Sequence, residues 1–279
     1  MNAKKRKTMK KTGNYIVRYF FVIIWMIIAL LPIYVAVMTS FTPFEKLGEA
    51  MILPKYFRWE NYVELARQTP LWQYLAASII YALGTSLFTV VIAILAAYAL
   101  SRFKFKFKIP FLMIIVAIQV VPQIVIVTPL YGLSYSTGLY DTYILIIIAM
   151  VATAIANPIL LLKGFFDSIP VTLEEAAVVD GCTRVGALVR VILPVSLPAV
   201  TTAFALSFFN GWDAYLYPMI LTSSPGKVSM TVGLSRMVDI VTPWNWIMAG
   251  TVIAIIPPIL IYLMAQKYLI GGLTAGSDK

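Results

Sequence analysis

The chain is dominated by six long apolar stretches, at about 15–40, 71–100, 109–132, 142–162, 196–222 and 245–270. Each stretch is long enough to cross a membrane as a helix, which needs about 20 predominantly apolar residues. The stretches are continuously apolar and do not alternate with polar residues, which favours helices over the strands of a closed barrel. We therefore predict an all-α polytopic membrane protein with six transmembrane helices in a single domain at 15–270.

Composition agrees with this pattern and removes several kinds of chemistry. Of 279 residues, 61% are apolar and only 12% are charged, and the mean hydropathy is +0.87. The chain has no histidine and one cysteine, Cys182, which rules out an intrachain disulfide, a histidine base and a cysteine-rich metal site. No phosphate-binding loop is present, because Gly226-Lys227 lacks the upstream glycine and the following hydroxyl residue. We predict no enzymatic activity, no cofactor and no metal, and we do not expect this chain to hydrolyse a nucleotide alone.

Membrane topology explains the net charge of +10 more simply than nucleic-acid binding does. If residues 1–14 form a cytoplasmic arm and 271–279 a cytoplasmic tail, 16 of the 22 basic residues lie on the inner side, counting Arg18 and Lys267 at the inner ends of the first and last spans. Basic residues concentrate in cytoplasmic segments, so we predict that both termini are cytoplasmic. The 101–108 segment, SRFKFKFK, then forms a short inner loop, and no nucleic-acid partner is expected. The first stretch exceeds the apolar run of a signal peptide and has no small-residue cleavage site after it, so it is interpreted as an uncleaved span.

The longest inner loop, 163–195, carries the most informative pattern. Thr172 and Glu175 have the spacing of a capping box, which predicts a helix beginning at Thr172. Gly181 suits the left-handed position that ends a helix. A second short helix is expected from Thr183 to Ile192, with Pro194 ending it and Leu193 forced out of the helical region. The pattern predicts two helices outside the bilayer that present small residues to a partner, the alternative being an ordinary amphipathic connecting loop.

This loop resembles a known signature. Glu175-Ala176-Ala177, Gly181, Val191 and Leu193-Pro194 match the pattern E-A-A-x3-G-x9-I-x-L-P of permease subunits of binding-protein-dependent ABC importers, with valine in place of isoleucine. The resemblance implies the type I ABC importer permease fold, and coupling helices that sit in a groove of a separate ATPase subunit. The residues implied in ATPase coupling are Glu174, Glu175, Ala176, Ala177, Asp180, Gly181, Val191, Leu193 and Pro194.

Two further segments resemble the carbohydrate branch of that family, and in particular the smaller membrane subunit of maltose-type transporters. They are 208–215 with Leu221-Thr222, and the ending 266–276. Asp213 departs from the asparagine common in the family. From the resemblance we expect Gly272, Leu273, Thr274 and Gly276 to contact the ATPase. The expected partners are a second permease subunit, two copies of an ABC ATPase, an extracytoplasmic binding protein, membrane lipid and a carbohydrate.

Polar residues within the spans are candidates for the solute path. Gln119 and Gln123 share one helical face, and uncharged amides suit a sugar, although hydrogen bonding between helices explains them equally well. Asp213 is expected inside the fifth span, where it contacts solute or a partner or belongs to an interfacial aromatic belt. Pro122 and Pro129 are expected to kink the third span. The full set of path candidates is Gln119, Gln123, Asn157, Asn210, Trp212, Asp213 and Tyr215.

These observations together predict one subunit of an importer. The chain is expected in a bacterial or archaeal cell (inner) membrane, forming half of the translocation path for a carbohydrate, with energy entering through 172–194. The rival interpretation is an integral membrane enzyme or a stand-alone channel. An enzyme should show clustered acids, histidines or cysteines, and a channel has no need of the coupling signature. The sequence leaves the solute open between a disaccharide, an oligosaccharide, a polyol and a glycerol phosphate.

Overall fold

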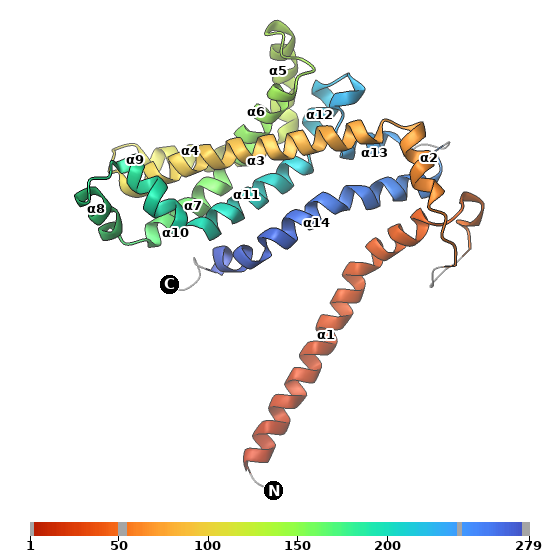
Figure 1. Ribbon diagram of the computed structural model, residues 1–279, viewed down its shortest axis with the longest axis horizontal. Coiled ribbons are helices and arrows are strands. Elements are labelled where there is room, and N and C mark those ends of the chain that lie inside the picture. Colours follow the sequence, from red (N-terminus) through yellow and green to blue (C-terminus); the bar gives the residue numbers. More distant parts are fainter. Residues whose placement is uncertain (1–2, 50–54, 239–241, 275–279) are drawn as a thin grey trace. The chain divides into compact units, whose positions relative to one another are not determined.

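The computed structural model describes residues 3–49, 55–238 and 242–274, and all regular elements within these ranges are helices. The chain divides into two compact units (Figure 1). The first unit comprises residues 1–69 and 237–253, and the second comprises 70–236 and 254–279. The first unit contains α1 (Ala3–Ser40), η1 (Phe44–Lys46), α2 (Glu60–Gln68) and the beginning of α14 (Trp244–Thr274).

The second unit contains the remaining helices and the rest of α14. In chain order they are α3 (Leu71–Arg102), α4 (Lys108–Val120), α5 (Gln123–Ser136), α6 (Tyr143–Ala154), α7 (Ala156–Ser168), α8 (Val171–Val179), α9 (Arg184–Ala187), η2 (Leu188–Ile192, a π-helix), α10 (Leu193–Val195), α11 (Leu197–Trp212), α12 (Leu216–Leu221), η3 (Pro225–Lys227) and α13 (Met230–Arg236).

In the first unit, two buried asparagines fasten the end of α1 to its neighbours. The Asn61 amide donates to the carbonyls of Ser40 (2.8 Å) and Thr42 (3.0 Å). The Asn245 amide, near the start of α14, also donates to the Thr42 carbonyl (3.2 Å). A helix end leaves carbonyl groups without intrahelical partners, and these side chains satisfy them. The end of α1 and the two residues after it are therefore held by α2 and by the start of α14.

In the second unit, α3 is the central helix, and α11, α7 and α6 pack along it. Most residues that α3 buries are small, including Ala82, Ala93 and Ala97, whereas Val91 and Leu95 of the same helix are exposed. Small residues let helix backbones approach closely, which is how membrane helices associate when lipid is as apolar as the side chains. The large exposed residues are left for lipid or a partner subunit.

Three helices are individually long and apolar enough to span a membrane: Arg18–Ser40 within α1, all of α3, and Trp244–Tyr268 within α14. Three further helix pairs pass the same test only together, and each is bent. The bends are 92° between α4 and α5, 51° between α6 and α7, and 82° between Arg184–Val195 and α11. The structure thus has three clear spans, and up to six if each bent pair counts as one.

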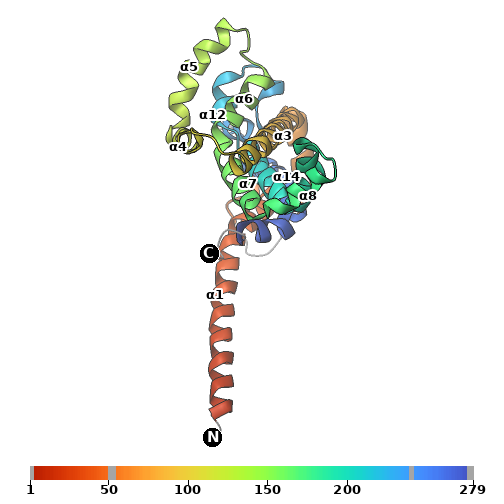
Figure 2. The ribbon, with the colours of Figure 1, turned by 90° about the vertical axis from the view of Figure 1, so that its left-hand side faces the viewer.

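The predicted third, fourth and fifth stretches are therefore not continuous helices. Pro122, which lacks a backbone N–H, immediately precedes α5, two residues after α4 ends at Val120, and allows the sharpest bend. Figure 2 views α3 nearly end-on and shows α5 standing away from it beyond this bend. The expected fifth span, 196–222, is interrupted at 213–215, so that α11 ends at Trp212 and α12 begins at Leu216. Asp213 therefore lies at the end of α11 and not inside a continuous helix.

Candidate functional site

The α8–α9 segment lies at the C-terminal end of α3 (Figure 1), and its turn is built around Gly181. Gly181 has φ +91°, a conformation that favours glycine because it has no Cβ. The N–H of Cys182 donates to the Ala177 carbonyl (2.9 Å), and the N–H of Gly181 donates to the Val178 carbonyl (3.0 Å). These two bonds form a Schellman motif. The predicted role of Gly181 as the residue that ends this helix is confirmed.

Other local predictions in this segment are wrong. The helix begins at Val171 and not at Thr172, and Pro170 precedes it without any side-chain cap, so no capping box forms. The second helix begins after Thr183 as expected, with the Thr183 hydroxyl accepting from the Gly186 N–H (3.0 Å). It does not end at Pro194. The wider π turn of η2 carries the helix on to Val195, and Leu193 keeps helical angles.

The residues expected to contact an ATPase divide by exposure. Glu175, Ala176, Asp180, Gly181 and Pro194 are exposed, and Val191 and Leu193 are half-buried. Among their neighbours, Val179 is 86% exposed and Val185 is 68% exposed. Exposed valines beside a carboxylate are typical of a surface that a partner covers.

Glu174 and Ala177 face the other way and are buried. The Glu174 carboxylate accepts a hydrogen bond from the Tyr98 hydroxyl and another from Arg102 Nε (2.9 Å), and both donors lie on α3. Only Glu175 of the adjacent glutamates is thus free to face a partner. Arg102, Glu174, Glu175 and Arg184 line one cavity of about 390 Å³ together with three valines of α8.

A second cavity, of about 330 Å³, brings together four of the predicted path residues. Gln119, Gln123, Asn157 and Asn210 all line it, and they come from α4, α5, α7 and α11 respectively. The lining contains no charged side chain. Within the described part of the chain these four amides have no hydrogen-bond partner, so their donors and acceptors are open to a polar ligand. We refer to this cavity as the amide pocket.

The other predicted path residues lie elsewhere. Trp212 is buried against Phe208, with ring centroids 6.1 Å apart, and contributes to the helix core. Asp213 and Tyr215 lie in the break between α11 and α12 and do not line the amide pocket.

Two hydroxyl residues of the amide pocket were missed from the sequence, Thr153 and Ser207. Thr153 precedes Asn157 by four residues and Ser207 precedes Asn210 by three. Residues three or four apart share a helix face, and this spacing was the available signal.

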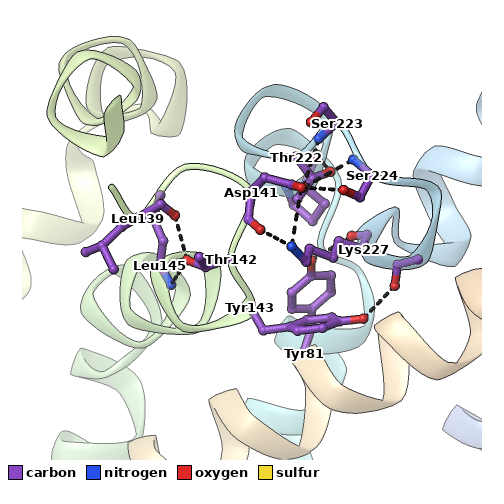
Figure 3. A network of polar contacts seen from close by, with 12 residues as sticks. Tyr81, Leu139, Asp141, Thr142, Tyr143, Leu145, Thr222, Ser223, Ser224 and Lys227 are labelled. Atoms are coloured by element: carbon purple, nitrogen blue, oxygen red, sulfur yellow. Dashed lines mark hydrogen bonds and ion pairs between the residues drawn. The ribbon is translucent and has the colours of Figure 1, made fainter. Parts of the chain in front are cut away.

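At the opposite end of α3, Asp141 fastens two loops together (Figure 3). Its carboxylate accepts from the backbone N–H of Ser223 (3.0 Å) and of Ser224 (3.2 Å), from the Ser224 hydroxyl and from Lys227 Nζ (3.3 Å). The Tyr81 hydroxyl, on α3, donates to the Lys227 carbonyl (2.6 Å). The start of α6, the loop after α12 and the N-terminal part of α3 are thereby joined.

The Asp141 carboxylate stays charged at neutral pH. Partial burial acts to raise the pKa of Asp141, but hydrogen bonds from Ser224, the Ser223 backbone and Lys227 outweigh it and hold the pKa below its usual value. A lowered folded pKa gives stability that is present above the unfolded pKa and is lost as pH falls through the folded pKa. The Asp141 contact therefore weakens only in acid.

The C-terminal residues expected to contact an ATPase fall at the edge of the described chain. Gly272, Leu273 and Thr274 belong to the last turn of α14. Gly276 lies outside the described residues.

Comparison with known proteins agrees with this arrangement. Residues 89–274 match the family described as "Binding-protein-dependent transport system inner membrane component". The chain belongs to this family, and it is therefore an inner-membrane, multi-pass permease component of an ABC importer.

Two relatives illustrate the match. The chain is 31% identical to the inner membrane ABC transporter permease protein YcjP of Escherichia coli over 98% of this chain and 99% of that protein. It is 33% identical to the trehalose/maltose transport system permease protein MalG of Thermococcus litoralis over 79% and 81% of the two chains.

A solved structure shows the same fold. A chain of a bacterial ABC transporter involved in the import of the acidic polysaccharide alginate superimposes with a TM-score of 0.80 at 24% identity, covering 96% of this chain and 98% of that one. The type I importer permease fold expected from the resemblance is confirmed.

Proposed function

We propose that this chain forms half of the translocation path for a carbohydrate. The second half belongs to another permease subunit, an extracytoplasmic binding protein delivers the solute, and two ATPase copies drive the cycle through residues 172–194. Both termini are placed in the cytoplasm, on the strength of the basic residues. The observation that carries the proposal is the exposed surface of α8 and its glycine turn, held rigidly at one end of α3.

The amide pocket supports a carbohydrate as the solute. Sugars offer many hydroxyl groups that donate and accept hydrogen bonds, and neutral amides can do both without charge. The volume of about 330 Å³ lies at the lower end of the range for small-molecule sites. Relatives named for trehalose/maltose and for sn-glycerol-3-phosphate transport indicate which solutes to test first.

Purification tests the assembly. The affinity-tagged chain is expressed in the native organism and solubilised in mild detergent. We expect an ABC ATPase and a second permease to co-purify with it. A preparation that contains this chain alone, or only copies of it, with no ATPase activity would contradict the proposal and favour a channel.

Substitution in the amide pocket tests the path. Asn157→Leu keeps the side-chain size but removes the amide, and we expect uptake of labelled trehalose or maltose to fall about tenfold, since losing one hydrogen bond to a polar ligand costs about 1.5 kcal/mol. ATPase activity of the purified complex should persist. The matched control is Met219→Leu, an exposed position of α12 outside the pocket. Equal uptake by both variants would remove the amide pocket from the path.

A further inference from the structure

The buried ion pair between Arg102 and Glu174 differs from the other ion pairs of the described chain. Its two side chains are 6% and 8% exposed, whereas in the others at least one partner is 30% exposed or more. Burying two charges carries a large desolvation penalty, and apolar residues of similar size often stabilise a fold equally well. Stability alone is therefore a weak explanation for this pair.

The contacts of the pair are complete. Glu174 accepts from Arg102 Nε (2.9 Å) through one oxygen and from the Tyr98 hydroxyl through the other. Arg102 also donates to the Ile169 carbonyl (3.1 Å), immediately before α8. Both ends of the ion pair are thus held in a fixed geometry, because the carboxylate and the guanidinium each have further partners.

The same end of α3 also holds α9. The Tyr98 hydroxyl lies 3.4 Å from the Arg184 carbonyl, and the Arg184 guanidinium stacks 5.3 Å from the centroid of the Phe103 ring, directly after α3. Two short helices that carry the exposed surface are therefore fastened to one helix end by polar contacts.

The far part of α3 is fastened in the same manner. The Met230 N–H donates to Ser78 Oγ (2.8 Å), and Tyr81 donates to the Lys227 carbonyl. The whole of α3 is an unbroken helix of 32 residues, about 48 Å long at 1.5 Å per residue, and these anchored residues lie toward its two ends. A continuous helix anchored at both ends transmits a displacement along its length.

We propose that α3 is the lever of this subunit, and that Glu174, Arg102 and Tyr98 are positioning residues that convert movement of α8 into movement of α3. The proposal rests on the proposed function, because it presupposes that an ATPase moves α8. Glu175 faces the ATPase, while Glu174 passes the motion inward. At the other end, the loops joined by Asp141 and Lys227 receive it.

The test compares Glu174→Gln with wild type in the complete complex reconstituted in proteoliposomes. The probes are labelled trehalose, maltose and glycerol 3-phosphate, and the readout is solute taken up per ATP hydrolysed. We expect this ratio to fall about tenfold, within the range of single-residue effects on coupling, while the amount of co-purified ATPase stays unchanged. A structural defect alone would lower the uptake ratio and the amount of co-purified ATPase together.

Two further variants make the outcome decisive. The double variant Arg102→Gln with Glu174→Gln leaves no unpaired buried charge, so it folds even if Glu174→Gln does not, and it should also lose coupling. Glu64→Gln is the matched control. Glu64 pairs with Arg58 in the first unit at the same 2.9 Å distance, but both side chains are partly exposed. The Glu64→Gln variant should couple normally.

The possible results separate the two proposals. A wild-type ratio in Glu174→Gln and in the double variant would overturn the lever. Loss of bound ATPase from both would also overturn it, since Glu174 would then act in docking. If wild type itself carries no ATPase, the proposed function fails and not the geometry of α3.

Discussion

Gly181→Asp is expected to abolish solute uptake while the chain still reaches the membrane. Gly181 has φ +91°, and residues with a Cβ pay about 1–2 kcal/mol in left-handed backbone. No atom lies within 4 Å of a Cβ added there, so the strain is confined to the turn. The turn must then relax, which shifts the exposed end of α8, and the new carboxylate lies on the surface proposed to meet the ATPase.

The measurement is uptake per unit of membrane-inserted protein. Gly181→Asn separates backbone from charge, because asparagine tolerates left-handed angles better than most residues and has the size of aspartate; it should retain part of the activity. The control is Gly48→Asp, which adds a carboxylate at an exposed glycine with open space around it, in the first unit. Comparable loss in Gly48→Asp, or normal uptake in Gly181→Asp, would contradict the assignment of the coupling surface.

Gly181 also shows why part of this site could be predicted from the sequence. A glycine after a short helical segment has few explanations, because the left-handed position that ends a helix excludes most other residues. The six apolar stretches were predictable for a similar reason, since lipid demands long apolar runs. In both cases the constraint acts within the segment itself.

The remaining features depend on what packs against the segment. Glu174 and Glu175 are adjacent and chemically equal, and only the approach of Tyr98 and Arg102 from α3 decides which one is buried. The breaks within the apolar stretches have the same origin: hydropathy does not distinguish a straight helix from two helices bent by 92°. The amide pocket was half-predicted. Gln119 and Gln123 both line it, but they do so from two helices bent by 92° and not from one helical face, so that part of the prediction is wrong. Spacing also cannot show that α7 and α11 meet them.

The second large effect is expected at the contact between α3 and α11. We expect Gly211→Val to prevent the subunit from folding. A Cβ added at Gly211 would lie 2.7 Å from Ala82 Cα and 3.0 Å from the Tyr81 carbonyl oxygen. Both are backbone atoms of α3, so no side-chain rotation relieves the collision. The two helices must separate, which opens the buried cluster of Ala82, Phe208 and Trp212.

We expect Gly211→Ala to lower the stability of the solubilised transporter by about 1–3 kcal/mol, the usual cost of overpacking, and Gly211→Val to prevent its accumulation. The control variant is expected to raise the stability and not to lower it. Gly164 lies within α7 with no atom within 4 Å of an added Cβ, so Gly164→Ala should raise stability by up to about 1 kcal/mol through helix propensity. Melting temperatures in detergent measure both. A Gly211→Ala protein as stable as Gly164→Ala would show that α3 and α11 do not approach this closely, and the lever proposed for α3 would lose its packing partner.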